Sequence, residues 1–271
     1  MPELPEVETT RRGIAPHIEN NTISNIIVRN RSLRWPVPTG LKSKLNNQVI
    51  RSVTRRAKYL LINTDAGTLI LHLGMSGSLR ILPINEAIDK HDHFEIQFKD
   101  DTCLRLRDPR RFGAVLWSKD DPADHKLLAS LGPEPLDKIF NAALLFERSR
   151  KRKTSIKQFI MDAKIVVGVG NIYASESLFL AGIRPTKPAG KITKAQAEEL
   201  VSAIKKILSA AIKQGGTTLK NFKSSDGKPG YFKQKLKVYD RKGEPCVKCK
   251  KPIKQIILGQ RSTFYCTHCQ K

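Results

Sequence analysis

The cysteines near the C-terminal end constrain the fold of this chain more than any other feature. Cys246 and Cys249 form one C-x2-C pair, and Cys266 and Cys269 form a second pair after a spacer of sixteen residues. Two such pairs separated by about 15 to 20 residues are typical of a tetrahedral zinc site with four thiolate ligands. Two disulfide bonds are the alternative, and a reducing compartment disfavours them. The spacing therefore predicts a small module folded around one structural zinc ion. The remaining cysteine, Cys103, is predicted to be a strand residue without a role.

Positive charge is concentrated in the second half of the chain. Residues 1–147 contain 21 Lys and Arg against 18 Asp and Glu, a net charge of +3, whereas residues 148–271 contain 28 against 7, a net charge of +21. Such a field suits a polyanion, either nucleic acid or an anionic membrane surface. The basic residues are scattered through helical and turn-rich segments, which favours nucleic acid over a membrane. We find no apolar run of about 18 residues and no signal peptide, so we expect a soluble cytoplasmic protein.

The hydrophobic pattern changes from strands to helices along the chain. A length of 271 residues allows about two domains. Short β-type runs between residues 22 and 117 favour an antiparallel sandwich or barrel. Beyond junctions at 132–135 and 148–153, apolar residues recur at helical spacing. The predicted strands are residues 25–28, 59–62, 68–73, 93–98 and 114–117, and the predicted helices are residues 155–162, 173–181 and 194–213.

The N-terminal end carries a proline beside acidic residues. Removal of Met1 leaves Pro2 as a secondary amine next to Glu3. An α-amino group with a pKa of about 7.7 to 8.0 is partly neutral and nucleophilic near pH ~7, so this end can do covalent chemistry. The alternative is a stiff end whose acids complement the start of a helix through residues 9–12. Taken alone, this segment favours the structural alternative.

Two glycines and an asparagine precede one of the predicted helices. Gly168 and Gly170 allow the backbone to approach a phosphate, and Asn171 can cap the helix whose N-terminal amides face that phosphate. A tight turn between packed helices explains the pattern equally well. Three lysines on the preceding predicted helix favour a helix-two-turn-helix DNA clamp, because they supply countercharges: Lys153, Lys157 and Lys164.

Five segments of the chain resemble those of bacterial formamidopyrimidine-DNA glycosylases. They are Pro2-Glu3-Leu4-Pro5-Glu6, Arg55-Arg56-Ala57-Lys58-Tyr59, Asp108-Pro109-Arg110-Arg111-Phe112-Gly113, Gly168-Val169-Gly170-Asn171-Ile172-Tyr173-Ala174 and the four-cysteine module. The resemblance extends from residue 2 to residue 271. It implies an α+β multidomain fold with an N-terminal antiparallel β-sandwich (2–132), a helix-two-turn-helix domain (133–223), a lesion-recognition loop and linker (224–236) and a zinc β-hairpin finger (237–271).

The same resemblance implies an activity and its catalytic residues. The family excises oxidised purines, such as 8-oxoguanine and formamidopyrimidines, and then cleaves the DNA strand by β,δ-elimination. Pro2 would attack C1′ of the damaged nucleotide and form a Schiff base, with Glu3 as the neighbouring general acid/base and Glu6 as structural support. Lys58 would donate a proton in β-elimination, with a surface lysine on a strand as the alternative. Arg261, placed by a hairpin turn, would bind the flanking phosphates and donate a proton in δ-elimination.

DNA contacts also follow from the resemblance. Extrusion of a base costs a few kcal/mol and leaves a gap in the duplex. Met75 and Phe112 match the residues that fill this gap, and Arg110 matches the one that pairs with the opposite base, for which the family prefers cytosine. Core packing is the alternative for Met75 and Phe112. Further predicted contacts are His91, Arg152, Lys157, Asn171, Lys220 and Tyr231, the last two in a segment that closes over the extruded purine.

One residue departs from the family pattern, and two other functions stay open. Lys250 follows the second cysteine, where the family commonly has glycine, so the turn around zinc is expected to differ without loss of ligation. An endonuclease VIII type enzyme prefers oxidised pyrimidines, typically has glycine at the position of Leu4, and lacks the Arg110 and Phe112 pattern. A non-catalytic DNA-damage-binding protein is the other alternative. We expect a bacterial, nucleoid-associated monomer on double-stranded DNA with oxidised purines.

Overall fold

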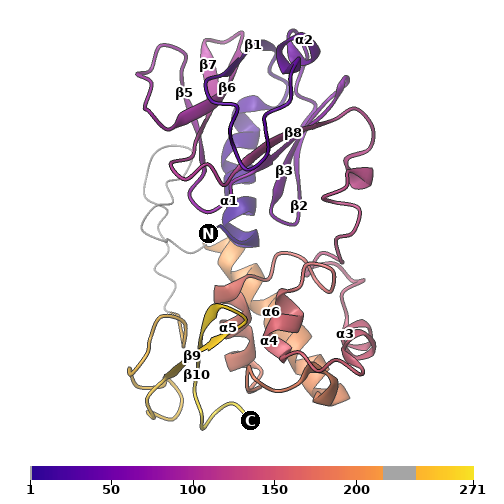
Figure 1. The fold of residues 1–271 in the computed structure, drawn as a ribbon, viewed down its shortest axis with the longest axis vertical. Helices are drawn as coiled ribbons and strands as arrows, with labels where there is room; N and C mark the ends of the chain where they lie inside the picture. Colours follow the sequence, from indigo (N-terminus) through magenta and orange to yellow (C-terminus); the bar gives the residue numbers. More distant parts are fainter. Residues whose placement is uncertain (1, 216–235) are drawn as a thin grey trace. The chain divides into compact units, whose positions relative to one another are not determined.

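The structure of the protein is a computed structural model that describes residues 2–215 and 236–271 (Figure 1). These residues divide into two compact units. Residues 2–129 and Gly215 belong to the first unit, which we call the β unit. Residues 130–214 and 236–271 belong to the second, which we call the helical unit. In the described part of the chain, no helix has both the length and the apolar character that a membrane crossing requires.

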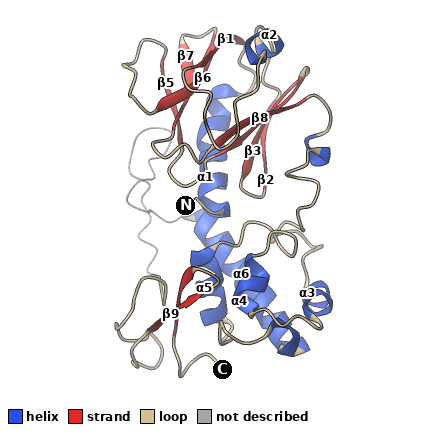
Figure 2. Cartoon of the chain, in the orientation of Figure 1, coloured by secondary structure: helices blue, strands red, loops and turns tan. Residues whose placement is uncertain are grey.

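Two four-stranded antiparallel sheets make up most of the β unit (Figure 2). One sheet has the order β1-β6-β7-β5 and the other has the order β2-β3-β4-β8. The strands are β1 (Ile23–Val28), β2 (Ser52–Arg56), β3 (Tyr59–Thr64), β4 (Gly67–His72), β5 (Ser78–Pro83), β6 (Asp92–Phe98), β7 (Thr102–Arg107) and β8 (Ala114–Ser118). The unit also contains helices α1 (Leu4–Ile18) and α2 (Leu41–Leu45) and the 3-10 helix η1 (Pro122–Asp124).

Helix α1 is anchored in the core of the β unit. Val7, Ile14 and Ile18 lie on one face of the helix and join apolar residues of both sheets in a single buried cluster. Full burial of each such side chain stabilises the fold by about 1.5 to 3 kcal/mol. Because this face is fixed against the sheets, the residues that precede the helix, Pro2 and Glu3, are held at the edge of a packed core.

The helical unit combines four helices with a C-terminal hairpin. Its elements are α3 (Ala142–Ser149), α4 (Ile156–Met161), α5 (Asn171–Leu180), the 3-10 helix η2 (Ala189–Lys191), α6 (Lys194–Lys213), β9 (Lys254–Leu258) and β10 (Arg261–Tyr265). Asn141, Ser155 and Thr193 start α3, α4 and α6, and each side chain accepts a backbone N–H three residues later. Phe179 of α5 and Phe264 of β10 share a buried cluster, so the hairpin packs against α5.

The observed elements confirm the predicted fold class and correct several details. The five predicted strands correspond to β1, β3, β4, β6 and β8, and α6 has the predicted bounds of 194–213. Helix α4 covers only residues 156–161, so Lys153 and Lys164 lie outside it and the prediction that they share a helix was wrong. The predicted strand ranges did not include β2, β5 or β7, although Cys103 lies in β7 as expected for a strand residue. The boundaries predicted between separate helical and finger domains stay a prediction.

Candidate functional site

The candidate nucleophile lies directly before helix α1. Glu3 is the N-cap residue in an extended conformation, and its backbone N–H donates to the Glu6 carboxylate at 2.8 Å. Glu3 is only 3% exposed, whereas Pro2 is half-buried. The bond to Glu6 fixes the backbone of the residue that follows the amine, which agrees with the supporting role predicted for Glu6. The N-terminal end is therefore a defined structural feature and not a free tail.

Lys58 occupies the turn between β2 and β3. Arg56 pairs with Tyr59, which leaves Ala57 and Lys58 as a two-residue connection. The Tyr59 ring lies 4.9 Å from the ring of His72, the last residue of β4. Burial, together with the positive charges of Lys58 and Arg34, lowers the pKa of His72 to about 4. Because both charges act on His72, Lys58 and Arg34 lie near this histidine in the β unit, where an anion would be favoured.

The candidate wedge residues lie on two loops that are tied together. Met75 follows β4 and is 38% exposed, and Phe112 precedes β8 and is 45% exposed. Core packing, the alternative interpretation of both, is therefore wrong. The Arg110 guanidinium lies 4.9 Å from the centre of the Phe112 ring. Gly74 has a left-handed φ of 61°, and a Cβ at this position would collide with the backbone of Phe112, so the two loops touch directly.

Asp108 links the two wedge loops through hydrogen bonds of its buried side chain. Its buried carboxylate accepts the Ser76 hydroxyl at 2.8 Å and the Gly113 backbone N–H at 2.7 Å. The backbone N–H of Arg110 in turn donates to the Ser76 hydroxyl oxygen at 3.3 Å. His93 donates from Nε2 to the Asp108 carbonyl at 3.0 Å. These bonds hold both loops in one arrangement.

His91 lies next to this loop assembly. Its ring stands edge-on to the His93 ring, with centroids 6.4 Å apart. Its backbone N–H donates to the Asp89 carboxylate at 2.9 Å, which fixes the end of the loop before β6. The structure thus brings Met75, Arg110, Phe112 and His91 into one region of the β unit.

Lys157 and Asn171 form a buried connection in the helical unit. Lys157 is 1% exposed, and its Nζ donates to the side chains of Asn171 at 2.6 Å and Thr263 at 2.7 Å and to the Ser262 carbonyl at 3.2 Å. The Asn171 amide donates to the same Ser262 carbonyl at 3.0 Å. The two residues thus fasten β10 to helices α4 and α5.

The expected cap of helix α5 was wrong. Asn171 is the first helical residue, and Gly170 is the N-cap without a side-chain bond. The Asn171 side chain is occupied by the finger instead. Of the three lysines expected as phosphate countercharges, Lys153 and Lys164 are exposed, whereas Lys157 is buried inside the unit.

Glu176 makes a second connection from α5 to the finger. Its carboxylate is 4% exposed and accepts three consecutive backbone N–H groups, of Lys237 at 2.9 Å, Val238 at 2.9 Å and Tyr239 at 2.9 Å. Charge-assisted bonds from a carboxylate to backbone N–H groups are roughly twice as strong as neutral ones. The Tyr239 hydroxyl also lies 3.4 Å from the Asn171 amide. The start of the finger is therefore fixed to the same helix as its hairpin.

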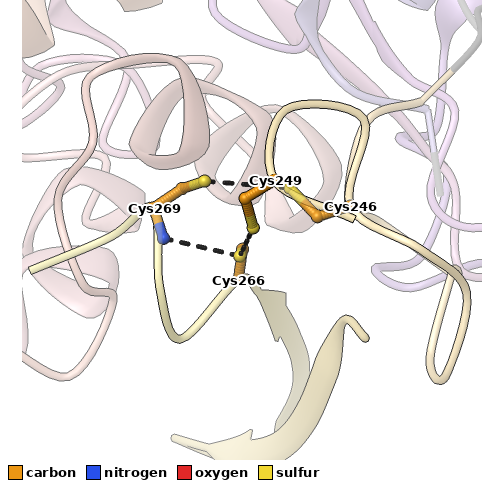
Figure 3. Close-up of side chains that lie close together, drawn as sticks. All are labelled: Cys246, Cys249, Cys266 and Cys269. Carbon is orange, nitrogen blue, oxygen red and sulfur yellow. Dashed lines mark hydrogen bonds between the residues drawn. The ribbon is translucent and has the colours of Figure 1, made fainter. Parts of the chain in front are cut away.

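The four cysteine thiols converge on one point (Figure 3). All four Sγ atoms lie within 4.8 Å of one another, with Cys246 and Cys269 at 3.9 Å and Cys249 and Cys266 at 3.4 Å. Zn–S bonds of about 2.3 Å in a tetrahedron require S–S separations of about 3.8 Å. The donor set and its geometry therefore fit zinc. The cluster is the site of one structural zinc ion, because four thiolates leave no position for a substrate.

The turn after Cys249 and the turn of the hairpin both contain residues in the left-handed conformation. Lys250 has a φ of 66°, the left-handed conformation that glycine adopts at no steric cost and other residues adopt at about 1 to 2 kcal/mol. Gly259 and Gln260 also have positive φ, of 55° and 58°, and form the hairpin turn that precedes Arg261. Arg261 is exposed at the start of β10, as predicted.

The remaining predicted contacts are one exposed residue of the helical unit and two residues outside the described part of the chain. Arg152 is exposed between α3 and α4, next to Lys151 with a left-handed φ of 59°. Lys220 and Tyr231 lie outside the described residues. The same holds for residues 224–235 of the predicted lesion-recognition loop and linker, 224–236.

Sequence reasoning missed several residues that organise the site. His72 had a weak signal, as a polar residue that ends an apolar strand before a glycine turn. Asp108 precedes Pro109, and Asp-Pro pairs favour the start of a turn. Glu176 had no signal, because its partners lie about sixty residues away.

These features together define a class of protein with an N-terminal β-sandwich, a helix-two-turn-helix unit and a four-cysteine zinc finger. Three family models match the chain in that order. They describe the N-terminal domain of formamidopyrimidine-DNA glycosylase (residues 1–115), its H2TH domain (131–223) and a zinc finger found in FPG and IleRS (243–271).

Similar proteins extend over the whole chain. The formamidopyrimidine-DNA glycosylases of Saccharophagus degradans and Idiomarina loihiensis are 56% and 57% identical, and each alignment covers 100% of both chains. The crystal structure of MutM (Fpg) from Thermus thermophilus has a TM-score of 0.88 at 34% identity and covers 99% of this chain and 98% of that chain. A Lactococcus lactis Fpg mutant in complex with DNA containing Fapy-dG has a TM-score of 0.92 at 34% identity, with 100% of both chains covered. The chain belongs to the formamidopyrimidine-DNA glycosylase family.

Proposed function

We propose that this protein is a bifunctional DNA glycosylase and AP lyase of base excision repair that removes oxidised purines from double-stranded DNA. The single observation that carries the chemistry is the start of α1. There Pro2, which becomes a secondary amine on removal of Met1, is followed by a buried carboxylate, Glu3, on a backbone that Glu6 fixes. Family membership supplies the substrate class, and lyase activity is typical of the family.

Pro2 and Glu3 carry the bond-breaking steps. After removal of Met1, the neutral nitrogen of Pro2 attacks C1′, the damaged base leaves as its nitrogen is protonated, and the ring-opened sugar forms a Schiff base. Glu3 moves the protons that ring opening requires, because it is the next residue in the chain.

Lys58 acts beside an anion-binding region. The positive charges of Lys58 and Arg34 both act on the partly buried His72, so a phosphate near them would be stabilised by several donors. We assign Lys58 as a proton donor in β-elimination and the region around it as the site of a phosphate next to the lesion.

The linked wedge loops replace the extruded nucleotide. Met75 and Phe112 are exposed apolar side chains on loops that Asp108 and Ser76 hold in place, so a wedge exists before DNA is bound. Arg110 presents its guanidinium above the Phe112 ring, where its planar donors suit the unpaired base opposite the lesion.

The second half of the chain, residues 148–271, supplies most of the affinity for DNA. Residues 148–271 have a net charge of +21, and phosphate contacts dominate protein–DNA affinity. We assign DNA contacts to Arg152, Asn171 and Arg261, with Arg261 also acting in δ-elimination. Lys220 and Tyr231 are assigned from the resemblance alone. The zinc held by the four cysteines supplies folding energy to the finger that carries Arg261. A cytoplasmic monomer associated with the nucleoid through DNA fits this role.

Glu3→Gln tests the division of labour between the amine and the acid. Strand cleavage is measured on a duplex with one 8-oxoguanine and on the same duplex with a preformed abasic site, with Glu199→Gln on the exposed face of α6 as a control. We expect Glu3→Gln to lose excision of 8-oxoguanine while it retains cleavage at the abasic site, because the amine survives. Equal retention of both activities would contradict the role of Glu3. A wild-type chain that binds both duplexes without cleaving either would favour the non-catalytic alternative.

A further inference from the structure

Glu8 gathers three arginines at the side of helix α1. Its carboxylate accepts Arg11 at 2.9 and 3.1 Å and Arg12 at 2.8 Å from the same helix, and Arg55 at 3.1 Å from strand β2. The carboxylate is 11% exposed and the Arg55 side chain is 13% exposed, so the pair is shielded from water. Ion pairs of this kind are screened less by salt than exposed ones. Glu8 therefore joins the nucleophile-bearing helix to the neighbouring hairpin.

Arg55 extends this connection to the turn that carries Lys58. Its Nη1 donates to the Ala57 carbonyl at 2.8 Å. Ala57 has a φ of 54°, a left-handed conformation that costs a non-glycine residue about 1 to 2 kcal/mol. The Ala57 carbonyl belongs to the same peptide group as the Lys58 nitrogen. The guanidinium that Glu8 holds thus fixes the peptide plane from which Lys58 projects.

Helix α1 also covers the free edge of strand β2. The strand lies at the end of its sheet, so one side of its backbone has no strand partner. At Val53, the carbonyl accepts Arg11 at 3.2 Å and the N–H donates to Glu19 at 2.7 Å. These two bonds satisfy groups that an exposed edge would leave to solvent. Helix and hairpin are consequently joined at two places along β2, at Val53 and at Arg55.

We propose that Glu8 and Arg55 are positioning residues that set the N-terminal end of α1 against the turn of Lys58. This inference rests on the proposed function, in which Pro2 and Lys58 act on one sugar. Reacting groups that are misplaced by about 1 Å can lose about 100-fold in rate, so a rigid bridge between their two elements has catalytic value.

The bridge persists over the pH range of a repair reaction. Burial alone would raise the pKa of Glu8, but hydrogen bonds from Arg11 and Arg12 and the charges of Arg11 and Arg55 lower it to about 2. The carboxylate therefore stays ionised at neutral pH.

Glu8→Gln and Asp65→Asn form a matched pair for the test. Both convert the carboxylate partner of an arginine on this hairpin into an amide. Asp65 pairs with Arg51 at the open end of the hairpin, and both of those side chains are exposed. Single-turnover excision is measured on a duplex with one 8-oxoguanine, and affinity is measured on a duplex with an uncleavable tetrahydrofuran abasic analogue. We expect Glu8→Gln to lower the rate constant by about 10- to 100-fold at unchanged affinity, while Asp65→Asn behaves as wild type.

The amplitude of the single-turnover phase reports the fraction of active protein, and it distinguishes a positioning defect from loss of the fold. A variant that is merely unstable lowers the amplitude of the single-turnover phase, whereas a positioning defect lowers its rate constant at full amplitude. Arg55→Lys serves if Glu8→Gln does not fold. A lysine can still pair with Glu8, but it has no second nitrogen to hold the Ala57 carbonyl, so a smaller loss of rate is expected.

Two results would overturn different claims. A folded Glu8→Gln or Arg55→Lys variant with the wild-type rate constant would overturn the positioning role alone. A wild-type chain without excision would overturn the proposed function, and this inference with it.

Discussion

Buried charged side chains have different kinds of partner in the two units of the chain. In the β unit, buried cations meet carboxylates: Arg55 meets Glu8, and Arg105 meets Glu95 at 2.7 Å with both side chains almost fully buried. In the helical unit, Lys157 donates to neutral oxygens, and Glu176 accepts backbone N–H groups. Pairing of opposite charges fixes the geometry of the buried side chains in the β unit. Neutral partners leave the positive field of the helical unit available for a polyanion. We infer from this difference that the β unit carries the chemistry and the helical unit carries the affinity for DNA. Each prediction below tests this division.

Loss of a zinc ligand should have the largest effect on affinity. Cys249→Ser should remove the metal and DNA binding together, because a four-thiolate zinc site contributes folding energy outright to the finger that carries Arg261. Zinc content by atomic absorption and DNA affinity by fluorescence anisotropy check this. Cys103→Ser, a buried cysteine of the β unit, is the control and should retain both. Tight DNA binding by a metal-free chain would contradict the dependence of affinity on the finger.

Acid should destabilise the β unit through His72. In the unfolded chain this residue takes up a proton near pH 6.5, whereas in the fold its pKa is about 4. The unfolded state therefore binds more protons below pH 6.5, so the free energy of unfolding falls as pH drops from 6.5 towards 4, by up to about 3 kcal/mol. Glu8, with a pKa of about 2 in the fold against 4.5, adds a further loss below pH 4.5.

Thermal unfolding followed by circular dichroism between pH 7 and pH 4 measures this loss. His72→Asn is the matched variant, because an amide oxygen can replace the Nδ1 atom that accepts the Gly74 N–H at 3.0 Å and does not titrate. An identical pH slope in both proteins would exclude His72 as the cause.

Loss of a buried cation of the helical unit should lower stability, whereas loss of an exposed one should lower the salt dependence of DNA binding. Lys157→Met leaves buried acceptors on Asn171 and Thr263 without their donor, which costs about 1 to 3 kcal/mol of stability. It should weaken binding of damaged and undamaged DNA alike. Arg152→Ala should leave the melting temperature unchanged but reduce the salt dependence of binding by about one unit of slope. Melting curves and affinities at several salt concentrations distinguish these outcomes. If Lys157→Met changed only the discrimination between damaged and undamaged DNA, Lys157 would act at the lesion and not as a structural connection.

Arg110 should affect selectivity more than affinity. Arg110→Ala should reduce excision most when cytosine is opposite the lesion, because a bidentate contact is worth about 1 to 3 kcal/mol of discrimination. Excision opposite all four bases is compared with that of Lys119→Ala, which removes an exposed cation of the same unit. An equal loss of excision with every opposite base would mean that Arg110 only contacts a phosphate. It would also weaken the division of chemistry and affinity between the two units.

The sequence predicted local features well and long-range contacts poorly. The cysteine spacing and the periodicity of α6 are local, and both correspond to the structure. The exposure of Met75 and Phe112 was expected from the resemblance, whereas their spacing alone favoured core packing. The burial of Lys157 did not, because a six-residue helix does not reveal that a strand a hundred residues later covers it. Glu8 carried no signal for its bond to Arg55, since the partners are 47 residues apart.

The identity of the attacking nitrogen is the most direct test of the central claim that chemistry belongs to the β unit. Borohydride is added during reaction with duplex DNA containing 8-oxoguanine, and the protein–DNA adduct is digested and mapped by mass spectrometry, which also establishes whether Met1 is removed. The account predicts a stable adduct on the N-terminal peptide that begins at Pro2. An adduct mapped to Lys58 or to a lysine of the helical unit, or normal excision without any adduct, would contradict it.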